Sequence, residues 1–170
     1  MAAYTTIELA RIAPSPGDGK RIEVELDPGK VELGDDEYGL AGAAVNARLE
    51  VSRTAAGYAL RLNFEGELEG PCMRCLEPVR SAIEVEAREV DQPGTDDEEL
   101  RSPYVDEGQL DLTAWAHDAL ALALPQQILC RPDCAGLCPV CGETLNDAPA
   151  GAHDHPREPD PRWAKLRELQ

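Results

Sequence analysis

Residues 58–64, Tyr-Ala-Leu-Arg-Leu-Asn-Phe, alternate apolar and polar side chains, as a strand with one buried face requires. The same alternation precedes them at 45–51 and follows them at 83–87, and Thr-Ala-Ala-Gly at 54–57 forms a turn between the first two. Three such strands predict an antiparallel meander with one face in water. Residues 4–9 and 21–26 add two short strands. Residues 27–40, rich in Gly, Asp and Glu, predict a loop or short irregular connection.

A helix is predicted after the meander. Asp111 can cap it, and Pro125 ends it after about Leu124. One face carries apolar residues at spacings of three and four: Leu112, Trp115, Ala116, Ala119, Leu120, Ala123 and Leu124. His117 lies beside that face, where a lone histidine is more often a surface or packing residue than a ligand.

Two further segments complete the chain. Residues 91–108 have seven acidic residues and one basic residue, which predicts a mobile loop without a binding site. Residues 160–169 predict a short amphipathic helix with Asp160 as its cap and Pro161 in its first position. We therefore expect an α+β protein: an antiparallel β-meander or barrel-like body, with a helix and a zinc-binding, Cys-rich C-terminal segment. The expected division is a body at 1–108 and a part at 109–170 that holds both helices and a metal lobe.

The most specific feature is a set of eight metal-ligand residues in four close pairs. Three pairs are cysteines and the last is a His-x-His, and together they are Cys72, Cys75, Cys130, Cys134, Cys138, Cys141, His153 and His155. Cys72-Met-Arg-Cys75 falls between the second and third strands of the meander, as a knuckle at a hairpin tip would. Gly142 follows the Cys138–Cys141 pair and allows the tight turn of a zinc knuckle.

Two pairings of these residues remain open. The four cysteines at 130–141 could form one local site, which leaves the other two pairs unexplained. Alternatively, Cys72 and Cys75 join Cys130 and Cys134, while Cys138 and Cys141 join the two histidines. We prefer the second pairing, which uses every residue and clips the hairpin to the end of the helix across more than fifty residues. It predicts two zinc ions, and the first predicts one.

Other uses of these cysteines are weaker interpretations. A thiol–disulfide enzyme could use Cys72 and Cys75, with Arg74 lowering a thiol pKa, but the expected βαβ context is missing. Catalytic zinc needs an open coordination position, which a site with four protein ligands does not leave. A set of four cysteines could also hold rubredoxin-like iron in place of zinc. The sequence contains no phosphate-binding loop, dinucleotide fingerprint or nucleophile elbow.

Charge and length limit the partners and the compartment. The 170 residues carry a net charge of −17, which repels nucleic acid and suits a basic protein. Residues 130–170 hold five basic against seven acidic residues, so this segment is about −2 and the first 129 residues about −15. No signal peptide or membrane-length apolar run is visible. We therefore expect a cytoplasmic protein without a membrane partner or small-molecule substrate.

The order of these motifs resembles a known family. The matching stretches are Cys72-Met-Arg-Cys75-Leu76, the 111–125 helix ending Ala-Leu-Ala-Leu-Pro, Leu129-Cys-Arg-Pro-Asp-Cys-Ala-Gly-Leu-Cys-Pro-Val-Cys-Gly-Glu-Thr-Leu-Asn146, and Asp160-Pro-Arg-Trp-Ala-Lys-Leu166. Over roughly residues 40–170 they look like the YceD family, the bacterial large-ribosomal-RNA accumulation proteins. Many members of that family have Cys-x-Cys where this chain has His153-Asp-His155. Since neutral histidine also binds zinc, the exchange supports the second metal site.

The resemblance implies a non-enzymatic role in accumulation or maturation of large-subunit ribosomal RNA. It implies two kinds of partner, the RNA itself or a basic ribosomal protein. The alternatives are an acidic chaperone or adaptor for such a protein without RNA contact, and a thiol–disulfide redox protein. From position alone, the candidate RNA or partner contacts are Arg74, Arg80, Arg131 and Arg162.

Overall fold

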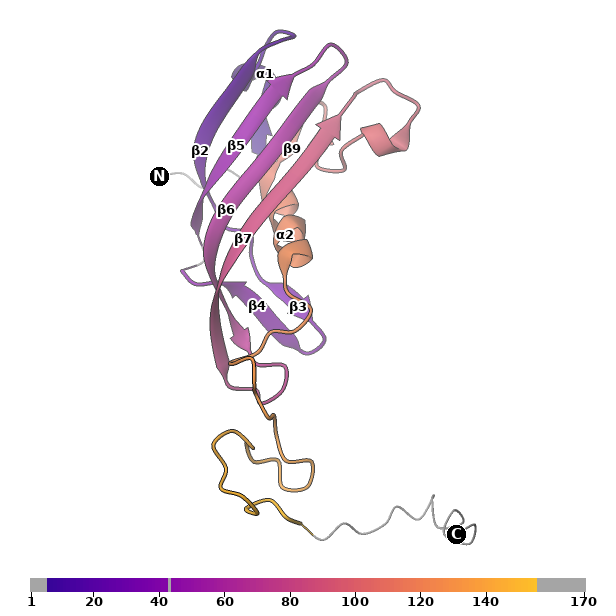
Figure 1. Ribbon diagram of the computed structural model, residues 1–170. Helices are drawn as coiled ribbons and strands as arrows, with labels where there is room; N and C mark the ends of the chain where they lie inside the picture. Colours follow the sequence, from indigo (N-terminus) through magenta and orange to yellow (C-terminus); the bar gives the residue numbers. More distant parts are fainter. Residues whose placement is uncertain (1–5, 43, 156–170) are drawn as a thin grey trace, which may run out of the picture.

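The computed structural model describes residues 6–42 and 44–155 (Figure 1). Its centre is the predicted antiparallel meander of β5 (Val45–Arg53), β6 (Tyr58–Pro71) and β7 (Pro78–Asp91), with β2 (Gly19–Leu26) paired to β5 at the edge. The predicted α+β class, an antiparallel β body with a helix, is confirmed. The alternation of the sequence explains the two faces, because the paired residues Leu49 and Leu62 are fully buried. The opposite face carries cross-strand ion pairs such as Arg61–Glu86.

The β6–β7 hairpin is longer than the sequence predicted. Its register runs from Tyr58 opposite Asp91 to Pro71 opposite Pro78, although the alternation indicated only residues 83–87 for the last strand. The hairpin extends past the rest of the sheet to a tip at residues 72–77 (Figure 1). The tip therefore presents the first cysteine pair beyond one end of the sheet.

The prediction of a loop at 27–40 is wrong. The segment forms a hairpin of β3 (Val31–Leu33) and β4 (Asp36–Leu40), and β4 pairs with β6 at Gly39–Glu69 and Leu40–Leu68. Most of its Gly and acidic residues lie at the turn or at exposed positions, whereas Tyr38 is buried and donates a hydrogen bond from its hydroxyl to the Pro71 carbonyl (3.1 Å). Composition predicted a loop because few of these residues are apolar. Tertiary pairing with β6 overrides that preference.

A second, three-stranded sheet pairs a strand that precedes the β body in sequence with two strands that follow it. β1 (Thr6–Glu8), which confirms part of the predicted strand at 4–9, pairs with β9 (Gln109–Asp111), and β9 pairs with β8 (Val105–Asp106). The one-turn helix α1 (Leu9–Ile12) follows β1. Residues 91–108, expected to be a loop, also contain the 3-10 turn η1 (Glu98–Leu100). The end of that segment is fixed, since Tyr104 stacks on Trp115 with ring centroids 6.4 Å apart.

The predicted helix is α2 (Leu112–Ala123). Asp111 caps it by accepting a hydrogen bond from the Ala114 N–H (3.0 Å), and the helix ends before Pro125. Five of the predicted apolar positions are buried against the sheet: Leu112, Trp115, Ala116, Ala119 and Leu120. His117 has the packing role that was favoured for it, with Nδ1 donating to the Pro28 carbonyl (2.9 Å). The expected division at 108/109 stays a prediction, and α2 shares its core with the sheet.

The apolar core has two parts. The larger fills the body between the sheet and α2. The smaller lies toward the tip of the β6–β7 hairpin and contains Tyr38, Leu68, Val79, Ile128 and three cysteines, Cys72, Cys75 and Cys134. Beyond α2, the described residues 124–155 contain turns and one isolated bridge, Leu137–Thr144, and extend past the hairpin tip (Figure 1). The helix predicted at 160–169 lies outside the described residues.

Candidate metal centres

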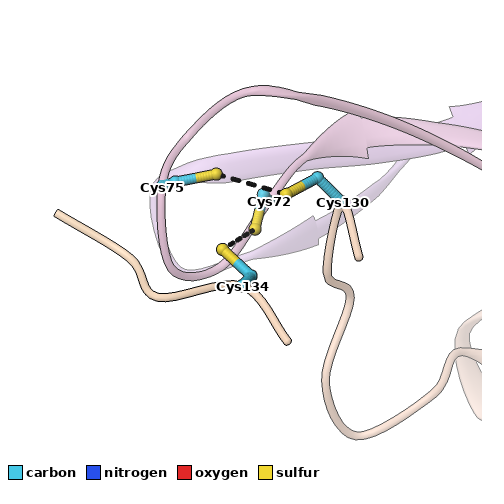
Figure 2. A group of neighbouring side chains, drawn as sticks. All are labelled: Cys72, Cys75, Cys130 and Cys134. Atoms are coloured by element: carbon cyan, nitrogen blue, oxygen red, sulfur yellow. Dashed lines mark hydrogen bonds between the residues drawn. The ribbon is translucent and has the colours of Figure 1, made fainter. Parts of the chain in front are cut away.

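The structure brings together the four cysteines that the preferred pairing assigns to its first site. We call Cys72, Cys75, Cys130 and Cys134 the tetra-cysteine cluster. Their four Sγ atoms lie within 4.8 Å of one another, with 3.7 Å between Cys72 and Cys134 and 3.5 Å between Cys75 and Cys130 (Figure 2). A Zn–S bond of about 2.3 Å places sulfur atoms about 3.8 Å apart in a tetrahedron, whereas a disulfide needs about 2.05 Å. The spacing fits a tetrahedral metal ion.

The first half of this cluster is a knuckle built by the hairpin tip. The Leu76 N–H donates to the Cys72 carbonyl (2.9 Å), which closes the turn, and the Arg74 N–H points at Cys72 Sγ (3.5 Å). The second half comes from the chain after α2, where the Met73 N–H donates to the Ile128 carbonyl (2.9 Å). These hydrogen bonds hold two segments, far apart in sequence, against each other.

Burial and hydrogen bonding push the thiol pKa values of the cluster apart. Burial opposes ionisation of Cys72, but hydrogen bonds from the backbone at Cys75, Arg74 and Cys130 lower its pKa to about 6. Burial and the neighbouring cysteines raise the pKa of Cys130 to about 12. Thiolates this close repel one another, so all four ionise together only beside a cation. The electrostatics therefore also suit a divalent metal.

The second cluster, which we call the Cys/His cluster, contains Cys138, Cys141, His153 and His155. One ligand atom from each residue lies within 4.8 Å of the others, and Cys141 Sγ is 3.3 Å from His153 Nδ1. The turn after the knuckle uses Gly142 at a φ of +75°, where its N–H donates to the Cys138 carbonyl (2.9 Å). Backbone hydrogen bonds at Cys141 and Val140 lower the pKa of the Cys138 thiol. Within the described part of the chain, His155 Nε2 is buried without a hydrogen-bond partner.

Both donor sets fit zinc. Four cysteines, and two cysteines with two histidines, are both usual tetrahedral ligand sets of structural zinc. A metal nitrogen bond would satisfy the buried Nε2 of His155, which otherwise has no partner among the described residues. Since each cluster offers four protein ligands, a tetrahedral ion in it would have no open position for a substrate. The arrangement suits a structural role.

Three of the four predicted contact arginines are engaged within the protein. Arg74 donates to the Cys134 carbonyl (3.0 Å), and Arg80 forms ion pairs with two glutamates, Glu67 and Glu69. Arg131 pairs with Asp147 (3.1 Å) and Asp133 (3.5 Å). Arg162 lies outside the described residues. Three of the four candidates thus contact carboxylate or carbonyl oxygens of the protein itself.

Sequence reasoning missed Asn146. This side chain is 8% exposed and contacts two sulfur atoms of the tetra-cysteine cluster, although it lies in the segment between the ligands of the other cluster. Its place in the motif Gly-Glu-Thr-Leu-Asn after the second knuckle was visible, but its direction was not. Only the folding back of the loop reveals the contact.

The fold and the two clusters define a class: a small antiparallel β protein with two groups of cysteine and histidine ligands that could each hold a metal ion. The chain belongs to the YceD family: the family described as "Large ribosomal RNA subunit accumulation protein YceD" matches residues 60–170. Membership suggests a role in the accumulation of large-subunit ribosomal RNA. The described residues contain no helix with the length and apolar character of a membrane span.

Relatives over most of the chain come from mycobacteria. Proteins of Mycobacterium bovis and Mycobacterium tuberculosis, each described as uncharacterized, are 33% identical over 181 aligned residues, covering 99% of this chain and 83% of the relative. An uncharacterized protein of Mycobacterium leprae is 30% identical over 133 residues, covering 75% of this chain and 60% of the relative. No solved structure matches. None of these descriptions names an activity.

Proposed function

We propose that this protein is a non-enzymatic, zinc-binding factor that supports accumulation or maturation of large-subunit ribosomal RNA in the cytoplasm. Family membership supports the process. The observation that carries the metal assignment is that eight ligand residues form two groups, each with its four donor atoms within 4.8 Å of one another. The tetra-cysteine cluster and the Cys/His cluster would hold one zinc ion each.

A scaffolding role for the first cysteine pair is supported by the burial of Cys72 and Cys75. A thiol–disulfide enzyme needs a reactive thiolate that a substrate can reach. Cys72, the thiol whose pKa is lowered to about 6, is 0% exposed. Burial of this thiol weighs against the redox alternative, and function then lies in the surface that the metal ions would hold.

The charge of the molecule favours a basic protein as the direct partner. Net charge is −17, and three of the four candidate arginines are occupied by intramolecular contacts. Polyanionic RNA would meet repulsion from most of this surface, whereas a basic ribosomal protein would be attracted. A chaperone or adaptor for such a protein, without RNA contact, is therefore the second candidate function.

Two measurements test the proposal. Elemental analysis of the purified full chain should give two zinc ions per molecule, and a metal-free protein with all six thiols intact would contradict the zinc assignment. Direct binding of large-subunit ribosomal RNA and of purified basic large-subunit proteins, each across a salt series, separates the two modes of action. Saturable binding of either supports the assembly role. Binding of neither, by the zinc-loaded protein, would count against it.

A further inference from the structure

We propose that Asn146 positions the sulfur atoms of Cys130 and Cys134, and that it thereby couples the two clusters. The inference rests on the proposed metal binding and deepens it. Asn146 would be a positioning residue for the tetra-cysteine cluster, supplied by the loop that the Cys/His cluster holds in place. Metal at one cluster would then raise the affinity of the other.

The orientation of the Asn146 amide is fixed by its surroundings. Its Oδ1 accepts a hydrogen bond from the Ala135 N–H (2.8 Å). Because a backbone N–H can only donate, the oxygen must occupy that side and the NH2 group must face the other way. There Nδ2 lies 3.5 Å from Cys134 Sγ and 3.9 Å from Cys130 Sγ.

The chemistry of this contact favours a metal thiolate. Four thiolates around one Zn²⁺ leave a net charge of −2, and each N–H donor near a sulfur atom offsets part of it. Asn146 is 8% exposed, so water competes little for its amide. The Arg74 N–H supplies a similar donor to Cys72 Sγ (3.5 Å) from the hairpin side. The donors thus come from both halves of the cluster.

The fold ties Asn146 to the other cluster. It lies between Cys141 and His153, so a metal ion at the Cys/His cluster would close the loop that contains it. That loop folds back onto the tetra-cysteine cluster, because the Leu145 N–H donates to the Gly136 carbonyl (2.8 Å). Arg131 pairs with Asp147 (3.1 Å) beside it. Coupling of this kind is reciprocal by thermodynamic necessity.

The test uses full-length protein and measures metal affinity, with Co²⁺ as the probe and Zn²⁺ in competition. The thiolate charge-transfer absorption of bound Co²⁺ distinguishes a four-sulfur site from a two-sulfur site. Asn146→Asp keeps an oxygen for the Ala135 N–H and replaces the amide NH2 by a carboxylate oxygen facing sulfur. We expect the affinity of the tetra-cysteine cluster to fall about 10- to 100-fold. Asn46→Asp makes the same chemical change at an exposed position of β5 and should leave it unchanged.

Coupling is tested separately by Cys141→Ser, which leaves Asn146 intact and stays informative even if Asn146→Asp does not fold. We expect Cys141→Ser to lower the affinity of the tetra-cysteine cluster about 5-fold or more in the wild-type background. The same change should have little effect in the Asn146→Asp background. The inference is overturned if either Asn146→Asp or Cys141→Ser leaves the affinity of the tetra-cysteine cluster unchanged, or if the losses in the double variant are strictly additive. In each of these cases, two metal ions bound per chain would still support the proposed function. A wild-type protein that binds no metal overturns both.

Discussion

His155 shows at the scale of one residue why a metal ion fits this chain. Its Nε2 is buried and has no hydrogen-bond partner among the described residues. A buried, unsatisfied polar atom costs about 1–3 kcal/mol. Coordination would remove that cost, and Cys141 and His153, whose Sγ and Nδ1 atoms lie 3.3 Å apart, belong to the same cluster.

The first prediction therefore concerns the histidines. His155→Ala should lower the zinc content from two ions to one per chain, because three remaining ligands hold zinc weakly at a partly exposed site. Elemental analysis after gel filtration measures it. His117→Ala is the matched control: this histidine donates to the Pro28 carbonyl, so the variant should keep two zinc ions. Equal zinc loss in both variants would contradict the assignment of His155.

At the scale of elements, the β6–β7 hairpin is the part that carries the first knuckle. Its base depends on Gly57, which lies directly before Tyr58, the residue that pairs with Asp91. A Cβ atom at position 57 would lie 1.8 Å from the Asp91 carbonyl oxygen. Any side chain here must displace the strand end.

The second prediction follows from that contact. Gly57→Ala should lower the free energy of unfolding by about 1–3 kcal/mol, as overpacking against backbone does. Chemical denaturation followed by circular dichroism measures the change. Gly19→Ala is the control, because its Cβ would meet only Ser52 Oγ at 3.7 Å. A loss at position 19 equal to that at position 57 would rule out the steric explanation.

The two clusters also differ in the length of chain that they close. Cys75 and Cys130 are 55 residues apart, whereas Cys141 and His153 are 12 apart. The entropic cost of closing a loop in the unfolded chain grows as the logarithm of loop length. It is about 3.5 kcal/mol for the first loop and about 2.2 kcal/mol for the second. The tetra-cysteine cluster is thus the stronger clip between elements.

The third prediction is that Cys130→Ser lowers the free energy of unfolding by at least about 1 kcal/mol more than Cys138→Ser does. Both variants lose one thiol, so the loss of a cysteine is matched. Urea denaturation of the zinc-loaded proteins compares them. Hydrogen exchange should also show faster opening of the hairpin tip in Cys130→Ser than in Cys138→Ser. The reverse order of stability would contradict the long-range clip.

At the scale of the whole molecule, the two parts of the core separate metal binding from the stability of the sheet. The larger core lies between the sheet and α2 and contains no cysteine. The smaller core contains three cysteines of the tetra-cysteine cluster. The body therefore has its own buried apolar surface, while the metal end depends on its ligands.

The fourth prediction is a stepwise response to a chelator. Metal should leave the Cys/His cluster first, since Cys141 is exposed while Cys72 is 0% exposed. Metal release followed with a chromogenic chelator should give a fast and a slow phase, and Cys141→Ser should remove the fast one. The β signal in far-ultraviolet circular dichroism should survive complete removal. Collapse of that signal when the first ion leaves would contradict the stability of the β body without metal.

Much of the fold could be predicted because its signals are local. Alternation at 58–64 and the cap at Asp111 are readable from neighbouring residues, and both are confirmed. The hairpin at 31–40 was missed, because its strands are short and gain their stability from pairing with β6. Asn146 was missed for a similar reason. An amide near sulfur is visible only after the loop folds back.

The sequence by itself determined which residues are able to bind metal, since cysteine and histidine spacing is a local property of the chain. It also determined the antiparallel body and the family. Only the tertiary structure decided which pairs meet. Grouping residues 55 positions apart depends on the length of the β6–β7 hairpin and on the path of the chain after α2. Those are long-range contacts, whose geometry is settled by packing of the whole molecule rather than by any short stretch.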